Sequence, residues 1–126
     1  MSDQIYREQF MEIYKSNANF GQMDFPTVTA DQVNFICGDK MTLQLKIVED
    51  KVVDAKFTGV ACAVSKTSAS IITEEIKGKS VNDLKKLTEQ DMLDLIKFDL
   101  TASRQQCALL CYHALKKALE NYGKKR

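Results

Sequence analysis

The 126-residue sequence contains no apolar run near the ~20 consecutive residues that a membrane-spanning helix requires. No signal peptide precedes the opening residues Met1, Ser2 and Asp3. We therefore expect a cytoplasmic protein with no membrane partner. Repeats, low-complexity segments and linkers are also missing, and this length is typical of one domain over residues 1–126.

An excess of charge of one sign is lacking too, because 18 Lys and Arg residues stand against 17 Asp and Glu residues, a net charge of +1. Basic residues gather only at the end of the chain, in 124–126, which is typical of a solvated terminus. This balance gives no support to nucleic acid as a partner.

The four cysteines lack the C-x-x-C spacing of a zinc knuckle, so an autonomous zinc finger is not expected. The single histidine, His113, follows Cys107 by six residues, and helical geometry turns it away from that cysteine. In a reducing compartment, cysteines in this number are more typical of metal ligands or nucleophiles than of disulfides.

Hydrophobic periodicity predicts an α+β fold, with a three-stranded antiparallel sheet and helices packed on one face. Residues 41–47 alternate apolar and polar side chains, as a strand with one buried face does. The other expected elements are a helix over 3–16, an edge strand within 26–36, a return strand through 53–57, a helix from 62 to Gly78, a short helix from Ser80, a helix from Thr88 to 96 and a final helix from Ser103 to about 122.

Three cysteines are expected at the ends of these elements. Cys37 lies between two strand segments, Cys62 at a strand-to-helix junction and Cys107 in the first turn of the final helix. Side chains at element ends can converge without disrupting a core, so a metal site is expected at one end of the sheet. A thiol at a helix N-terminus also lies near unpaired N–H groups, which favour the thiolate that binds metal.

Two neighbouring residues leave alternatives open. Asp39 follows Cys37 by two positions and is either an ordinary turn aspartate or a fourth, oxygen ligand. Cys111 follows Cys107 by four positions, so a continuous helix would place both on one face, where they could share a metal. Because Cys111 also belongs to the apolar seam of that helix, we expect a core cysteine.

Several of these features occur together in one known family. They are Cys37-Gly38-Asp39, Gly59-x-x-Cys62 leading into a Ser/Ala-rich helix, Lys77-Gly78-Lys79, Arg104-x-x-Cys107-Ala108, the opening helix with Tyr6, and Tyr14 followed by Asn19-x-Gly21. In this combination the chain resembles the U-type iron–sulfur cluster assembly scaffolds over nearly its whole length.

The resemblance implies a scaffold rather than an enzyme, with Cys37, Asp39, Cys62 and Cys107 at one exposed site. There a cysteine desulfurase delivers sulfur, and a [2Fe–2S] cluster is built for transfer to apo iron–sulfur acceptor proteins. Iron is therefore the expected metal, and isolated protein could also carry zinc. We further expect Cys107 to accept persulfide sulfur, with Arg104 one turn earlier stabilising its thiolate.

The chain departs from the family at several places, and two of them bear on the expected function. Gln106 stands where the main branch has histidine and the zinc-dependent branch often has lysine, which leaves Asp39 or Cys111 as the fourth donor. Residues 100–104 keep only the first residue and the basic end of the Leu-Pro-Pro-Val-Lys chaperone motif, so a dedicated Hsp70-type chaperone is not expected.

Two other functions fit the same residues. One is a zinc-dependent sulfurtransferase, in which zinc holds the four residues and one thiolate exchanges during transfer; the absence of that branch's insertion between Cys62 and Cys107 argues against it. The other is an interaction domain that zinc merely stabilises.

Overall fold

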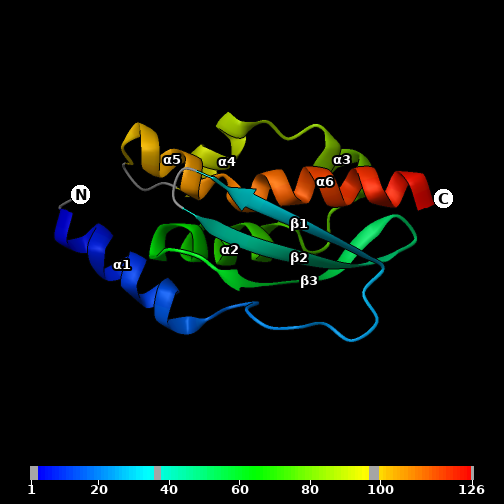
Figure 1. Cartoon of the computed structure of the whole chain (residues 1–126), viewed down its shortest axis with the longest axis horizontal. Helices are drawn as coiled ribbons and strands as arrows, with labels where there is room; N and C mark the ends of the chain where they lie inside the picture. Colours follow the sequence, from blue (N-terminus) through cyan, green and yellow to red (C-terminus); the bar gives the residue numbers. More distant parts are fainter. Residues whose placement is uncertain (1–2, 36–37, 97–99, 126) are drawn as a thin grey trace.

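The computed structural model describes residues 3–35, 38–96 and 100–125. Figure 1 shows a sheet with helices running along it and with the two termini at opposite ends of the molecule. The elements, in chain order, are α1 (Asp3–Ser16), β1 (Val28–Asn34), β2 (Asp39–Val48), β3 (Lys51–Val60), α2 (Ala63–Ile76), α3 (Val81–Lys85), α4 (Glu89–Ile96), α5 (Ala102–Ala108) and α6 (Leu110–Lys125).

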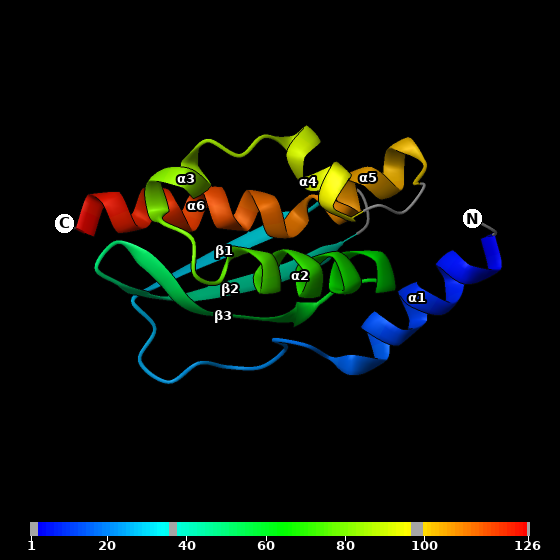
Figure 2. The same cartoon turned by 180° about the vertical axis from the view of Figure 1, so that it is seen from behind.

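The sheet has the order β1-β2-β3, and both strand pairs are antiparallel. Along β2 every second side chain is buried, beginning with Asp39 and Met41, as the alternating pattern predicts. The buried face packs against α6, which contacts β1 and β2, and against α2, which contacts β3 (Figure 2). The predicted α+β fold, a three-stranded antiparallel sheet with helices on one face, is confirmed.

Local capping chemistry explains where the middle helices begin. The Ser80 hydroxyl accepts a hydrogen bond from the Asp83 N–H and starts α3. Thr88 precedes α4, and its hydroxyl accepts from the Asp91 N–H while the Asp91 carboxylate accepts from the Thr88 N–H. Both predicted starts are confirmed. Within the described ranges, no helix has the length and apolar content of a membrane span.

The predicted final helix from Ser103 to about 122 is wrong in its start and in its continuity. Thr101, not Ser103, is the N-cap of α5, because its hydroxyl accepts from the Arg104 N–H. The helix is then interrupted at Leu109, and α6 follows from Leu110 to Lys125. The six consecutive residues 107–112 are all buried. A straight helix against one layer buries only a stripe, so a change of direction is needed to bury such a run.

This break determines where Cys107 lies. It is the sixth residue of the seven-residue helix α5, in the second turn rather than the first. Beyond the break, α6 runs along the sheet to the opposite end of the molecule, while α5 stays close to the start of α2 (Figure 1). Short α5 thus carries its cysteine to the end of the sheet where β2 begins and β3 finishes.

Candidate metal centre

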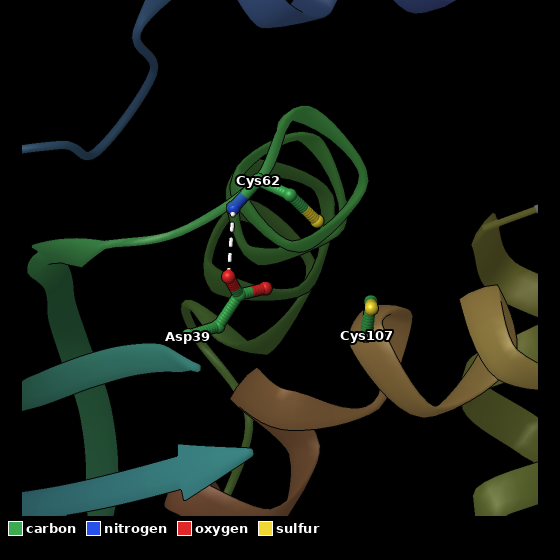
Figure 3. Close-up of side chains that lie close together, drawn as sticks. All are labelled: Asp39, Cys62 and Cys107. Atoms are coloured by element: carbon green, nitrogen blue, oxygen red, sulfur yellow. Dashed lines mark hydrogen bonds between the residues drawn. The ribbon is translucent and has the colours of Figure 1, made fainter. Parts of the chain in front are cut away.

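Three residues from three elements meet at this end of the sheet. Asp39 is the first residue of β2, Cys62 is the N-cap of α2 and Cys107 lies near the end of α5. Their potential ligand atoms, one carboxylate oxygen and two sulfurs, all lie within 4.8 Å of one another (Figure 3). The predicted Cys37 lies outside the described residues, two positions before Asp39 in the sequence.

Cys62 occupies the junction between β3 and α2 with extended backbone angles, φ −69° and ψ 169°. Its Sγ accepts a hydrogen bond from the Ser65 N–H at 3.5 Å, in the way that serine or aspartate caps a helix. The side chain is partly exposed. The predicted cysteine at a strand-to-helix junction is therefore present, with its sulfur at the helix N-terminus.

Asp39 differs from an ordinary turn aspartate because its residue surface is only 6% exposed. Its Oδ1 accepts from the Cys62 N–H at 3.2 Å, and its Oδ2 accepts from the Ser65 hydroxyl at 2.7 Å. A buried carboxylate needs such donors, because burial of an unpaired charge is costly. Asp39 thereby ties the start of β2 to the first turn of α2, with its carboxylate beside the two sulfurs (Figure 3).

Cys107 is 9% exposed, and its surroundings come from two further elements. The Asn34 side-chain amide, at the end of β1, donates to Cys107 Sγ at 3.9 Å. The Ser65 hydroxyl lies 2.9 Å from the Cys107 carbonyl oxygen. These contacts connect α5 to the end of β1 through the Cys107 sulfur and to the start of α2 through the Cys107 backbone.

Ser65 and Asn34 are site residues that the sequence interpretation missed. Ser65 follows the helix N-cap by three positions, the spacing at which capping-box residues face each other, and this spacing was the available signal. Asn34 offered no such signal. It pairs with Asp39 across β1 and β2, and that register becomes known only when the sheet is assembled.

Cys111 is fully buried in the hydrophobic core, where desolvation raises the pKa of its thiol to about 12. The thiol therefore stays protonated at neutral pH, whereas a metal ligand must be a thiolate. The break at Leu109 also separates Cys111 from Cys107, so the two do not share one continuous helical face. The structure agrees with the expected core position.

Three other residues near the cysteines in the sequence lie on α5 and α6. His113 is half-buried on α6, and its ring packs against Tyr112 with 5.4 Å between the centroids. Gln106 and Arg104 are exposed on α5. The role of Arg104 as a thiolate stabiliser stays a prediction.

The three donors suit a borderline-soft metal. At a metal–sulfur distance of about 2.3 Å, ligand atoms around a tetrahedral ion lie about 3.8 Å apart. The observed limit of 4.8 Å therefore requires only small side-chain rotations to bring all three donors onto one ion. Thiolates select zinc and iron–sulfur clusters, and a single carboxylate is a harder donor than either sulfur. An α+β domain with this donor set at one end of its sheet is suited to bind a metal ion or a cluster.

Comparison with known families makes this class specific. A family model described as the NifU-like N-terminal domain matches residues 5–126, so the chain belongs to that family. The resemblance to the U-type scaffolds is thereby confirmed.

Proteins similar to this chain are named either as iron–sulfur cluster assembly proteins or as a zinc-dependent sulfurtransferase. The chain is 35% identical to the iron-sulfur cluster assembly enzyme IscU of Drosophila melanogaster, over 97% of this chain and 80% of that one. It is 31% identical to the zinc-dependent sulfurtransferase SufU of Bacillus subtilis, over 93% of this chain and 90% of that one. The crystal structure of FiSufU from Fervidobacterium islandicum AW-1 superposes with a TM-score of 0.74 at 27% identity, covering 94% of this chain and 99% of that one.

Proposed function

We propose that this chain is a scaffold for assembly of a [2Fe–2S] cluster, with residues 1–126 acting as one domain. Sulfur comes from a cysteine desulfurase, and the finished cluster passes to apo iron–sulfur acceptor proteins. The convergence of Asp39, Cys62 and Cys107 is the observation that carries this proposal. Cys37, adjacent to Gly38 and close to Asp39 in sequence, completes the proposed ligand set.

The donor set explains how such a scaffold can both hold and release a cluster. Thiolates bind the irons firmly, whereas a carboxylate is the harder and weaker donor toward an iron–sulfur unit. Asp39 therefore supplies one labile position beside the sulfurs of Cys62 and Cys107. The cluster is the cargo of the reaction, so the protein's contribution is to position ligands rather than to turn over a substrate.

Sulfur transfer requires an accessible thiolate. In this step the thiolate attacks the outer sulfur of the desulfurase persulfide, a new S–S bond forms, and the partner's cysteine leaves as a thiolate. We propose Cys107 as the acceptor, with Arg104 favouring its thiolate, although Cys107 is only 9% exposed. Cys62 is the alternative first acceptor, because it is the more exposed of the two.

The desulfurase is proposed to cover two exposed apolar side chains near the ligand residues in the sequence. Phe35, two positions before Cys37, is 92% exposed, and Val60, two positions before Cys62, is 81% exposed. Both lie on segments that carry proposed ligands, so a partner docked over them would bring its own cysteine to the site. Large apolar side chains with this exposure are typical of contact surfaces.

A zinc-dependent sulfurtransferase is the second candidate, supported by the similarity to SufU. One observation favours the scaffold over it. The alignment with SufU extends over 134 positions, more than the 126 residues of this chain, so SufU has residues with no counterpart here. We take these extra residues to include the insertion that the zinc-dependent branch carries and this chain lacks.

Replacing the labile ligand tests the proposed function. In Asp39→Cys a fourth thiolate would take the oxygen position, and its softer, more covalent bond to iron should keep the cluster in place longer. We expect transfer of the reconstituted cluster to an apo-ferredoxin to slow by about tenfold. The measurement is the appearance of the ferredoxin absorption spectrum, alongside the thermal midpoint of the apo-protein.

Asp31→Cys is the matched control, since it adds a thiol at an exposed position of β1 and leaves Asp39 in place. Its transfer rate should equal that of the unmutated chain. Unaltered or faster transfer from a folded Asp39→Cys variant would contradict a ligand role for Asp39. A lower thermal midpoint with no change in transfer would show a purely structural aspartate.

A further inference from the structure

The buried Ser65 hydroxyl lies within reach of three acceptors, and all three belong to the proposed ligand residues. Ser65 Oγ is 2.7 Å from Asp39 Oδ2, 2.9 Å from the Cys107 carbonyl oxygen and 3.4 Å from Cys62 Sγ. The residue is 1% exposed, so water does not compete for this position. A hydroxyl has one proton and donates one strong hydrogen bond at a time. The Ser65 hydroxyl can therefore donate its proton to only one of these acceptors at a time.

The two carboxylate oxygens of Asp39 accept hydrogen bonds from different donors. Oδ1 accepts from the Cys62 N–H, a bond that holds the carboxylate at the start of α2. Oδ2, the oxygen bonded by Ser65, points away from that N–H toward the side of the site where Cys107 lies (Figure 3). A metal that binds the carboxylate through Oδ2 shares this oxygen with the Ser65 hydroxyl, and its positive charge weakens the O–H···Oδ2 hydrogen bond.

The Cys107 carbonyl gives the Ser65 hydroxyl another acceptor. It lies 2.9 Å from Ser65 Oγ, whereas the neighbouring Leu109 N–H donates to the Gln105 carbonyl at 3.0 Å. When Oδ2 binds metal, the Ser65 proton can turn to this carbonyl, and no buried polar group loses its partner. When the metal–Oδ2 bond breaks, the proton can return to the carboxylate.

We propose that Ser65 is a positioning residue that favours release of the metal or cluster from Asp39. This inference rests on the proposed scaffold function and adds a residue that tunes its labile ligand. A hydrogen bond to a carboxylate is roughly twice as strong as one to a neutral carbonyl. Ser65 consequently stabilises the released carboxylate more than the bound one, and metal–Oδ2 bond breaking is coupled to formation of the O–H···Oδ2 bond.

The sign of the effect on metal affinity distinguishes this role from a structural one. Ser65→Ala removes the hydrogen bond that metal binding weakens, so the variant should bind Zn²⁺ roughly fivefold more tightly and release it more slowly. If Ser65 only stabilised the fold, the variant would bind zinc more weakly. Affinity and release are measured under anaerobic conditions by competition with a chromogenic zinc chelator.

Three variants complete the experiment. Ser68→Ala removes another buried hydroxyl from α2 and should leave zinc affinity unchanged. Ser65→Thr keeps a hydroxyl and should bind zinc as the unmutated chain does, and it keeps the test available if Ser65→Ala does not fold. In an Asp39→Ala background, a further Ser65→Ala change should have no effect on zinc affinity.

Weaker or unchanged zinc binding by a folded Ser65→Ala variant would overturn the role of Ser65, as would an effect that persists without Asp39. A folded Ser65→Thr variant whose zinc affinity differs from that of the unmutated chain would also overturn this role. These outcomes leave the scaffold proposal intact when zinc still requires Cys62 and Cys107. If zinc binding by the unmutated chain does not depend on those cysteines, the proposed function itself fails, and the role of Ser65 fails with it.

Discussion

Replacing Cys62 or Cys107 with serine is expected to abolish cluster assembly, whereas Cys111→Ser should keep the cluster and lose stability. The first two sulfurs face the same point beside Asp39, while Cys111 lies in the core beyond the break at Leu109. Loss of a residue that only supports a metal ligand costs 10–100-fold in affinity, so loss of a ligand should cost more than about 100-fold. Cys37→Ser should behave like the first two.

Burial of a serine hydroxyl at position 111 is expected to lower the free energy of unfolding by about 1–3 kcal/mol. Each variant is reconstituted with ferrous iron, cysteine and a desulfurase, and the cluster is quantified from its visible spectrum. Cys111→Ser is the matched control, because it removes a thiol of the same chain without touching the site. Complete loss of the cluster in a folded Cys111→Ser variant would place Cys111 among the ligands and contradict this assignment.

Gly59→Ala is expected to destabilise the protein strongly and to disrupt the site with it. Gly59 has φ 139°, a conformation that side chains rarely adopt, and it pairs with Met41 across β2 and β3. An added Cβ would lie 2.1 Å from the carbonyl oxygen of Lys40, an overlap with backbone that cannot rotate away. We expect a loss of at least about 3 kcal/mol in the free energy of unfolding.

Gly78→Ala separates backbone strain from collision. Gly78 also has a positive φ, 86°, but an added Cβ would meet nothing within 4 Å. Its replacement should cost about 1–2 kcal/mol, the price of the left-handed conformation alone. Urea unfolding of both variants measures the difference. If the Gly59→Ala variant were as stable as Gly78→Ala, the end of β3 beside Cys62 could move away from β2 to make room for the methyl group. That result would contradict a rigidly positioned site.

Local signals predicted most of the fold. The strict alternation of 41–47 defines the central strand, and the hydroxyls of Ser80 and Thr88 define helix starts, since each signal acts over only a few residues. The break at Leu109 escaped prediction because it depends on tertiary packing. A run of apolar residues looks the same in a straight buried helix and in two helices that change direction to follow the core.

The sequence pointed to the candidate site residues but not to the hydrogen bonds that connect them. The cysteines and Asp39 stood out by their positions at element ends, and similarity to a family grouped them. The hydroxyl of Ser65 bonds Asp39, which is 26 positions earlier in the chain, and reaches the carbonyl of Cys107, which is 42 positions later. No spacing rule connects residues so far apart, because only the folded sheet and helices bring them together.

Purification under strict exclusion of oxygen, followed by iron, sulfide and zinc analysis and a visible spectrum, tests the scaffold function most directly. The protein is expressed together with a cysteine desulfurase and compared with a Cys62→Ser/Cys107→Ser variant prepared in the same way. We expect iron and sulfide in equal amounts, with a brown chromophore that the variant lacks. One zinc per chain with no sulfide and no colour, before and after reconstitution, would contradict the scaffold and favour the zinc-dependent sulfurtransferase.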